Sequence, residues 1–428
     1  MTAVQELWDR VTDRVRRAAP GAGRAPAIAA LDIGTEFAKA LVVTVERDPW
    51  GRLVGVVRGS GRQRQGLSHM QSGTVSDIDA VVANCRIALD QARAMAGRRP
   101  MAAVIGIAGE LVKGTTSSLT TRRDDPRASL TDAELERLVS RAQDRSLREA
   151  EERIRWESGL DRLDVRLVHA AIVEMRIDGY AVTNPIGFTG SQVELHVFNA
   201  FAPMVHLGAL QSVADALELQ LLGVIAEPYA VATCLDPGEL GDAGAVFIDI
   251  GGGTTDVALV RGGGISGTKM LALGGRAFTK GLVERLGVSF AEAERAKLAV
   301  ADDARPEVAE TLAEDARIWR DGVELMIGEL AGDELLPGRV LLCGGGADLP
   351  QVRDVLAEDG WWGRLPFARR PKVRALSPDE VMGLRDATGS LATRQDVTPM
   401  ALAHQALILD AGTSVDRAMR DVVREMEL

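Results

Sequence analysis

The sequence predicts an α/β protein with two related lobes, and three observations support this fold class. Apolar runs rich in β-branched residues, typical of buried strands, are followed by longer segments with helical periodicity. A pattern of strand, glycine turn and strand occurs twice, around Asp32 and around Asp249. Of the 428 residues, 46% are hydrophobic, which is enough for more than one sizeable core.

The clearer of the two patterns lies at residues 245–260. Residues 245–250 have the character of a buried strand, three glycines at 251–253 force a tight turn, and residues 254–260 return as a second strand. Glycines let backbone N–H groups approach an anion, and consecutive turn amides make a concave anion site. Asp249 is placed to hold a hydrated Mg²⁺ beside bound phosphates. An ordinary glycine hairpin is the alternative interpretation.

The other pattern begins with Leu-Asp-Ile-Gly-Thr at residues 31–35 and continues through Lys39 into an apolar run. When Asp32 is set over Asp249, the Ile-Gly pairs that follow them also align. Two such hairpins in one chain suggest two related halves that hold a polyphosphate from opposite sides.

Three motifs of the chain resemble those of the actin-like ATPase superfamily. Its two phosphate motifs are similar to residues 32–39 and 249–256, and its adenosine motif is similar to Leu-Leu-Cys-Gly-Gly-Gly-Ala at residues 341–347. Within the superfamily, Asn-Pro-Ile-Gly-Phe-Thr-Gly-Ser-Gln-Val-Glu-Leu at residues 184–195 resembles the bacterial cell-division protein FtsA. The resemblance extends over about residues 27–410.

This resemblance implies an actin-like ATPase fold. Two lobes with mixed sheets flanked by helices would enclose a nucleotide in the cleft between them, and a small α/β subdomain would be inserted. The expected organisation is an N-terminal amphipathic helix and linker at 1–26, the first part of the first lobe at 27–76, the region of the inserted subdomain at 77–192, the second part of the first lobe at 193–235, the second lobe at 236–350, and a return through both lobes to a C-terminal helix at 351–428.

The resemblance also implies that ATP and Mg²⁺ are bound, and it assigns residues to their site. Catalytic roles are expected of Glu227, Asp32 and Asp249, and the two aspartates would hold the metal through water. Nucleotide contacts are expected from the glycine turns and their polar neighbours, namely Gly34, Thr35, Lys39, Gly251, Gly252, Gly253, Thr254, Thr255, Gly274, Gly275, Glu294, Lys297, Gly344, Gly345 and Gly346.

Glu227 follows a predicted strand at residues 221–226 and precedes Pro228. Proline is favoured in the first turn of a helix, so Glu227 could simply cap the helix that follows. In the superfamily this junction lies beside the γ-phosphate, and the matching polar residue orients the attacking water. We favour the functional interpretation because a carboxylate there suits water activation.

Two features near the second hairpin leave alternatives open. Arg276 follows a glycine pair after which the family often has an acidic residue, and this departure bears on metal coordination and hydrolysis rate. Glu294 and Lys297 are three residues apart on a predicted helix, where they form either an exposed ion pair or contacts to the nucleoside.

The glycine-rich residues 262–267 match a dinucleotide fingerprint in spacing, but their context predicts a hairpin turn.

Charge and cysteine usage restrict the partners and the compartment. The formal net charge is −11, which argues against non-specific nucleic-acid binding. The three cysteines are far apart and lack zinc-ligand spacing, which is typical of a reducing compartment. Because no apolar run reaches the length of a membrane span, we expect a cytoplasmic protein.

The two ends of the chain each predict an amphipathic helix. Residues 2–17 place Leu7, Trp8 and Val11 on one face, so this helix is expected either to rest on a membrane or to pack on its own lobe. Residues 414–428 carry a second apolar stripe, but their acidic residues oppose anionic lipids. The N-terminal helix is therefore the better candidate for peripheral membrane contact.

The function expected from these features is that of an FtsA-like, ATP-binding protein of cell division with slow ATP hydrolysis. Such a protein would form filaments and link division proteins, such as a tubulin-like GTPase, to the inner face of the cell membrane. A PilM-type adaptor of pilus assembly and a small-molecule kinase of the same superfamily are the alternatives.

Overall fold

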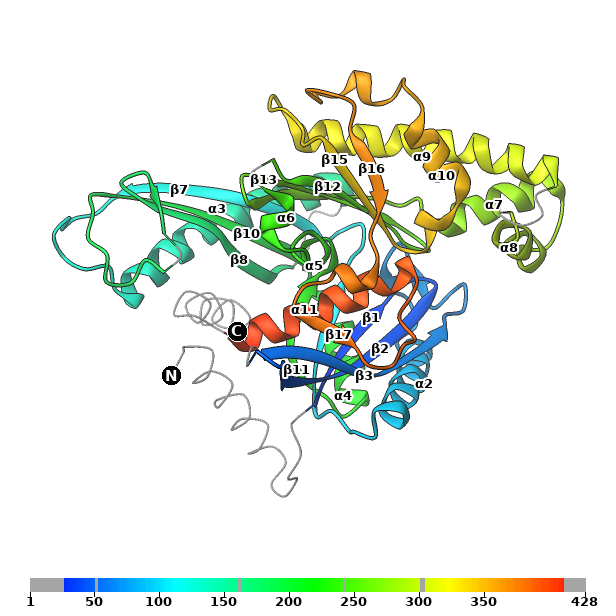
Figure 1. The fold of residues 1–428 in the computed structure, drawn as a ribbon, viewed down its shortest axis with the longest axis horizontal. Coiled ribbons are helices and arrows are strands. Elements are labelled where there is room, and N and C mark those ends of the chain that lie inside the picture. Colours follow the sequence, from blue (N-terminus) through cyan, green and yellow to red (C-terminus); the bar gives the residue numbers. More distant parts are fainter. Residues whose placement is uncertain are drawn as a thin grey trace.

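The computed structural model describes residues 27–50, 53–159, 164–182, 184–241, 243–300 and 305–411. Both predicted terminal helices, 2–17 and 414–428, lie outside the described residues. Two large sheets organise the described part, and Figure 1 shows them one above the other with helices packed against each.

The first sheet forms the lower lobe in Figure 1 and has the strand order β11-β6-β1-β2-β3-β17. Strands β1 to β3 form an antiparallel meander, whereas β6 pairs parallel with both β1 and β11. Helix α2 packs on β2 and β3, and helix α11 packs on β1, β6 and α5. The bounds are β1 (Ala27–Ile33), β2 (Phe37–Arg47), β3 (Leu53–Arg64), α2 (Ile78–Ala96), β6 (Ala102–Ile107), β11 (Gln220–Ala226), α5 (Glu227–Ala232), β17 (Leu384–Asp386) and α11 (Val397–Ala411).

Helix α2 lies unusually close to its sheet. The Asp77 side chain accepts a hydrogen bond from the Ala80 N–H at its start, and Gly97 ends the helix with a φ of +57°. Gly59 and Gly61 of β3 face it, and a Cβ on either would stand about 2 Å from a carbonyl oxygen of α2. The close packing of helix and strand therefore depends on glycine at these two positions.

The second sheet runs through the upper lobe, with β16, β15, β12, β13 and β14 in this order. Trp319 of α9 is buried in its core and donates a hydrogen bond to the Thr255 hydroxyl. Residues 262 and 263, both at positive φ, form the turn between β13 and β14, so the hairpin interpretation of residues 262–267 is confirmed. The bounds are β12 (Ala245–Ile250), β13 (Thr255–Arg261), β14 (Gly264–Leu271), α7 (Gly275–Leu286), α8 (Phe290–Leu298), α9 (Pro306–Ala331), β15 (Arg339–Cys343), α10 (Pro350–Ala357) and β16 (Lys372–Ala375).

The inserted subdomain extends this second sheet with the strand order β7-β10-β8-β9. It joins β14 through the pairing of Gly267 with Thr115, and helix α3 packs on its strands. In Figure 1 the subdomain projects to the left of the two lobes. The bounds are β7 (Lys113–Arg122), α3 (Asp132–Ser158), β8 (Val165–Ile177), β9 (Tyr180–Ala181) and β10 (Gln192–Pro203).

Two of the expected domain boundaries differ from this arrangement. The expected inserted region, 77–192, includes α2 and β6, which belong to the first sheet. Residues 193–203, expected in the first lobe, form most of β10 in the inserted subdomain. The physical reason is that periodicity reveals whether a segment is a buried strand or helix, but not which sheet it joins.

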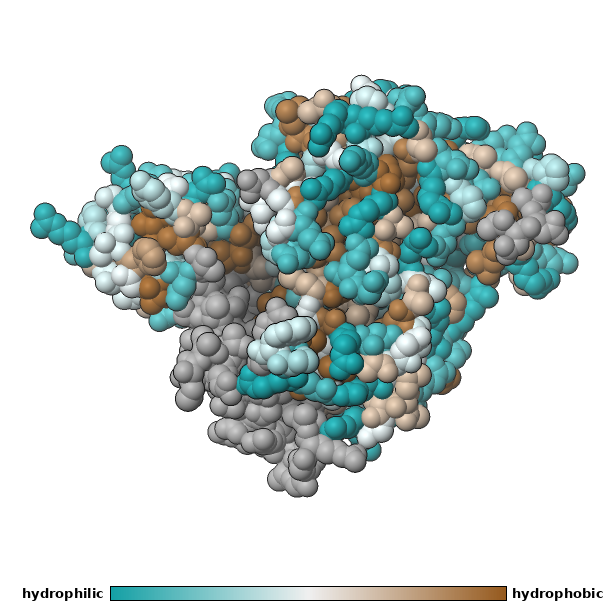
Figure 2. All heavy atoms as spheres, viewed as in Figure 1, coloured by the Kyte–Doolittle hydropathy of each residue, from teal (hydrophilic) through white to brown (hydrophobic). Residues whose placement is uncertain are grey.

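Shorter elements complete the described part. They are the two-stranded sheet of β4 (Met70–Gln71) and β5 (Thr74–Val75), the helices α4 (Met204–Ala216) and α6 (Pro237–Leu240), and the 3₁₀ helices η1 (Gly345–Asp348), η2 (Trp362–Arg364), η3 (Pro378–Glu380) and η4 (Arg394–Asp396). On the face in Figure 2, hydrophilic residues cover most of both lobes, and hydrophobic ones show mainly near the middle and on the inserted subdomain. Within the described ranges, no helix is long and apolar enough to cross a membrane.

Candidate functional site

The two hairpins predicted from the sequence have the same local geometry. In the first, the Gly34 N–H donates to the Phe37 carbonyl over 3.0 Å, and in the second the Gly251 N–H donates to the Thr254 carbonyl over 2.9 Å. The two tips also meet, because a Cβ on Gly252 would lie 2.7 Å from the Cβ of Glu36. Glycine is therefore needed where the tips of the two lobes touch.

A cavity of about 320 Å³ lies beside these tips and is lined by both lobes. Its volume is at the lower end of the range for small-molecule sites. The structure brings most of the expected site residues together around it, namely Asp32, Gly34, Thr35, Lys39, Glu227, Asp249, Gly251, Gly252, Thr254, Gly275, Glu294, Lys297, Gly344, Gly345 and Gly346.

Three residues expected to contact the nucleotide, Gly253, Thr255 and Gly274, are not among the residues that line this cavity. Thr255 is buried, and its hydroxyl donates to the Leu273 carbonyl over 2.7 Å, since alternation along β13 turns it toward the core. A Cβ on Gly253 would lie 2.7 Å from the Thr35 hydroxyl oxygen, and one on Gly274 would lie 2.7 Å from the Gly251 carbonyl oxygen. These residues support the hairpin tips and do not form the cavity wall.

Carboxylates from both lobes gather in the cavity. Asp32 and Asp249 stand at matching places in the two hairpins, and Asp256 is the register partner of Asp249 across the second one. Burial, together with the charge of Asp249, raises the pKa of Asp256 to about 8. Burial also raises the pKa of Asp249, although a 2.6 Å hydrogen bond from the Thr398 hydroxyl opposes this.

Asp256 was not among the expected site residues, although the sequence carried a signal for it. In the first hairpin, Lys39 pairs in register with Asp32 seven residues earlier, and in the second Asp256 stands at the same spacing from Asp249. The Lys39 ammonium lies 2.9 Å from an Asp32 carboxylate oxygen and donates to the Gln395 carbonyl over 2.7 Å. Lys39 is thus already neutralised.

Glu227 is the first residue of α5, and the N-cap position before it is taken by Ala226. The capping interpretation is therefore wrong. The Glu227 carboxylate packs against Gly106 of β6, because a Cβ on Gly106 would stand 2.5 Å from one of its oxygens. Burial, followed by the charges of Asp32, Asp256 and Asp249, raises the pKa of Glu227 well above its usual range. A cluster of buried carboxyl groups favours a bound cation, which would replace the protons that these groups otherwise hold.

The opposite side of the cavity is formed by α8 and by the glycines after β15. The Lys297 ammonium lies 2.8 Å from a Glu294 carboxylate oxygen, and both residues are buried, so the exposed ion-pair interpretation is wrong. Burial alone would raise the pKa of Glu294, but Lys297 and a hydrogen bond from Thr279 hold it below its usual value. Gly344 has a φ of +78°, and a Cβ there would lie 2.2 Å from an Asp249 oxygen.

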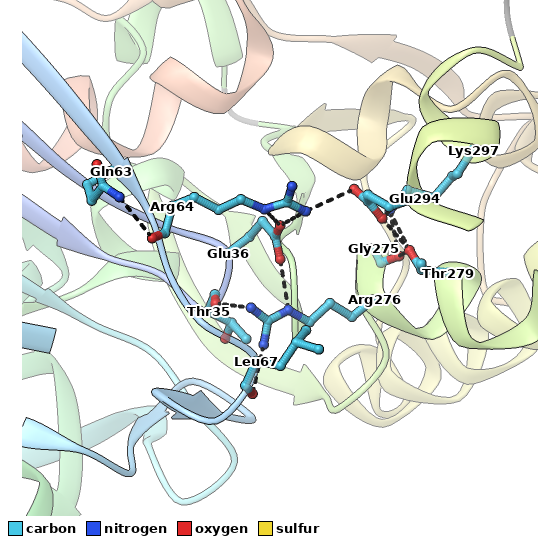
Figure 3. Close-up of polar contacts among 10 residues, drawn as sticks. All are labelled: Thr35, Glu36, Gln63, Arg64, Leu67, Gly275, Arg276, Thr279, Glu294 and Lys297. Carbon is cyan, nitrogen blue, oxygen red and sulfur yellow. Dashed lines mark hydrogen bonds and ion pairs between the residues drawn. The ribbon is translucent and has the colours of Figure 1, made fainter. Parts of the chain in front are cut away.

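A network of ion pairs crosses the cavity between the two hairpin tips (Figure 3). The Arg276 Nε lies 2.8 Å from a Glu36 carboxylate oxygen, and its Nη2 donates to the Thr35 carbonyl over 2.7 Å. The Arg64 Nε donates to the other Glu36 oxygen over 2.6 Å, and its Nη2 lies 3.8 Å from Glu294. Sequence reasoning singled out Arg276 only as a departure from the family, and it gave no signal for its partner Glu36.

The residues present fit a nucleotide whose metal is held mainly by phosphates and water. Among the residues that the structure describes, no group of three or more His, Cys, Asp or Glu side chains could hold a metal ion by itself. Mg²⁺ commonly keeps several waters and takes one or two carboxylates together with substrate phosphates. The tip glycines Gly34, Gly251 and Gly252 line the cavity without a side chain, so their backbone faces the space that such phosphates would occupy.

Sequence comparisons connect the chain with FtsA proteins. A family model described as "Cell division protein FtsA" matches residues 246–393. FtsA of Neisseria meningitidis serogroup B is 26% identical over 272 residues, which make up 63% of this chain and 60% of that protein. FtsA of Bacillus subtilis is 25% identical over 382 residues, or 83% and 79% of the two chains. The chain thus spans about 60% of the Neisseria relative.

Among solved structures, a chain of the "PilM-PilN type IV pilus biogenesis complex" has a TM-score of 0.59 at 18% identity, over 89% of this chain and 98% of that one. At this identity the likeness shows the fold alone. The predicted fold class is confirmed, because the chain has the actin-like ATPase fold with mixed sheets flanked by helices. Its sequence is FtsA-like within that superfamily.

Proposed function

We propose that this chain binds Mg-ATP between its two lobes and works as an FtsA-like, nucleotide-dependent adaptor in cell division. One observation carries the binding proposal: two equivalent hairpins from different lobes meet tip to tip beside a cluster of carboxylates. Backbone N–H groups of both tips would hold the phosphates, and the start of α7 would fix the second tip, because the Gly275 and Arg276 N–H groups donate to the Gly251 and Gly252 carbonyls.

The charge of the cavity favours a metal complex of the nucleotide over the free anion. Seven carboxyl groups line the cavity against five Lys or Arg side chains, and a divalent cation that displaces the protons of Glu227 and Asp256 would offset the negative charge that a triphosphate brings. Asp32 and Asp249 would hold Mg²⁺ through water, and the ion would neutralise charge on the phosphates. Glu227, once ionised by the nearby cation, would accept a hydrogen bond from the attacking water and orient it.

The roles outside the cavity form the finer part of the proposal. Self-association into filaments, contact with division proteins such as a tubulin-like GTPase, and placement in the cytoplasm at the inner face of the membrane are proposed from the FtsA-like sequence. The alternative of a PilM-type adaptor has only a likeness in fold to support it. A small-molecule kinase would transfer phosphate only when an acceptor is added, so ATP turnover without acceptor argues against it.

Calorimetric titration of ATP in the presence of Mg²⁺ tests the central proposal. Replacing Asp249 by alanine should weaken binding by about tenfold or more, because the water-held metal loses a carboxylate partner. The difference between wild type and Asp249→Ala should shrink when EDTA removes the metal. Asp359→Ala is the matched control, since Asp359 is highly exposed and pairs with Arg370 outside the cavity. Equal Mg-ATP affinity in wild type and Asp249→Ala would overturn the assignment.

A further inference from the structure

Arg276 and Glu36 form the central contact of the network in Figure 3, and they come from different lobes. Arg276 is the second residue of α7, and its backbone N–H donates to the Gly252 carbonyl of the second hairpin tip. Glu36 stands at the tip of the first hairpin. Both side chains are largely buried, with 11% and 17% of their surfaces exposed. The pair is therefore shielded from water more than a surface ion pair, and its electrostatic interaction is correspondingly stronger.

The Glu36 carboxylate is held as a bound anion would be. One of its oxygens accepts a hydrogen bond from Arg276 and the other accepts one from Arg64, so two guanidinium groups bind the same carboxylate. The remaining cations of the cavity have carboxylate partners of their own. These pairs are Lys39 with Asp32, Lys297 with Glu294 and Arg62 with Asp396.

We propose that Glu36 occupies the place of a phosphate group in this structure, and that the polyphosphate of a nucleotide displaces it from Arg276 and Arg64. This inference rests on the proposed function, because it concerns the same cavity. Arg276 then becomes a phosphate ligand. Displacement is feasible because Glu36 is at a hairpin tip that lines the cavity.

If Glu36 competes with phosphate, removal of its charge should raise the affinity for Mg-ATP. An ion pair that only connects the lobes predicts no such gain. If the ion pair merely held the lobes together, losing it would loosen the cavity and weaken binding. If Glu36 competes with phosphate, the neutral variant Glu36→Gln frees two arginines and removes like-charge repulsion. We expect Mg-ATP to bind Glu36→Gln about five- to tenfold more tightly than wild type, as expected for one unit charge several ångströms away in a partly buried site.

The test is calorimetry with Mg-ATP on the full chain, with a matched control and a second variant. Glu46→Gln removes the same charge from a carboxylate that also pairs with an arginine, Arg58, but that lies outside the cavity lining. It should leave the affinity unchanged. Arg276→Gln should weaken binding, and adding Glu36→Gln to it should restore less affinity than the same change gives in wild type.

The outcomes separate this inference from the proposed function. Tighter binding by Glu36→Gln, with Glu46→Gln unchanged, supports both. Binding by wild type that stays equal or weakens in Glu36→Gln overturns the phosphate-mimic role and leaves the nucleotide site standing. Absence of Mg-ATP binding in wild type and in Glu36→Gln overturns both. Thermal unfolding of each variant, measured without nucleotide, confirms that the compared proteins are folded.

Discussion

Burial, and after it the charges of Asp32, Asp256 and Asp249 in the same cavity, raise the pKa of the Glu227 carboxyl group well above its usual range. Without a cation this group favours its protonated form, in which it cannot accept a proton from water. A divalent cation beside the aspartates would lower that pKa and make Glu227 a base only when metal and nucleotide are bound. Such coupling would restrict water activation to the loaded site.

Exchanging Glu227 for glutamine should therefore reduce ATP turnover by about 10²- to 10⁴-fold, the usual contribution of a general base, while Mg-ATP affinity changes little. Phosphate release under saturating Mg-ATP measures the turnover, and calorimetry measures the affinity. Glu239→Gln, at an exposed position on α6, serves as the control. Unchanged turnover in Glu227→Gln, or loss of ATP binding, would remove Glu227 from the proposed role.

Sequence reasoning located those site residues that belong to a repeated or contiguous motif. Asp32 and Asp249 could be predicted because the two hairpins repeat the same residues. Gln395 and Thr398 reach the same cavity from a segment about 150 residues beyond the second hairpin, and nothing in their own neighbourhood predicts that contact. Arg64 and Glu36 were missed for a related reason, because an ion pair between lobes depends on how the lobes meet.

At the scale of single elements, α2 shows why the boundary of the inserted subdomain was misplaced. Its apolar spacing correctly predicts a helix with one buried face, which includes Val81, Cys85 and Leu89. That spacing does not show which element the buried face packs against. Gly59 and Gly61 offered a clue, because glycines two apart in a strand permit close approach of another backbone. In the structure that backbone is α2.

This close approach predicts a large effect of a small side chain. In Gly61→Ala the new Cβ would stand 1.9 Å from the Ala88 carbonyl oxygen, so helix and strand must separate. We expect the free energy of unfolding to fall by about 1–3 kcal/mol, as for other overpacked sites. Urea denaturation followed by circular dichroism measures it.

Gly208→Ala provides a control of opposite sign. Gly208 lies within α4, and a Cβ there meets open space, so alanine should raise the free energy of unfolding by about 0.5–1 kcal/mol through helix propensity. If Gly61→Ala were as stable as wild type, the helix would have to lie farther from β3 than the structure places it.

For the whole molecule, the prediction of two related lobes was accurate because each lobe carries its own copy of the phosphate hairpin. The way in which the subdomain continues the second sheet was not predictable, since β14 and β7 pair only at Gly267 and Thr115. A single pair of register partners leaves no periodic signal in either strand. Ion pairs between the tips, in contrast, connect the two lobes through a contact that a bound nucleotide could change.

Such a contact between the lobes would give the proposed membrane attachment a physical reason to depend on nucleotide. A single short amphipathic helix binds a bilayer weakly, whereas a filament presents many such helices on one surface. If ATP favours filaments, and if residues 2–17 form the anchor, then Mg-ATP should increase sedimentation of the full chain with vesicles of phosphatidylethanolamine and phosphatidylglycerol. Leu7, Trp8 and Val11 would enter the interface while the arginines stay at the headgroups.

Two truncations decide which end of the chain binds. Removing residues 1–20 should abolish sedimentation with vesicles, whereas removing residues 414–428 should preserve it, because the acidic residues of the C-terminal stripe are repelled by the anionic lipid. Electron microscopy of the same samples shows whether filaments form, so that loss of the anchor is distinguished from loss of assembly. Vesicle binding that survives the first truncation, or that is missing from the full chain when filaments are present, would contradict an N-terminal anchor and leave that helix as a packing element.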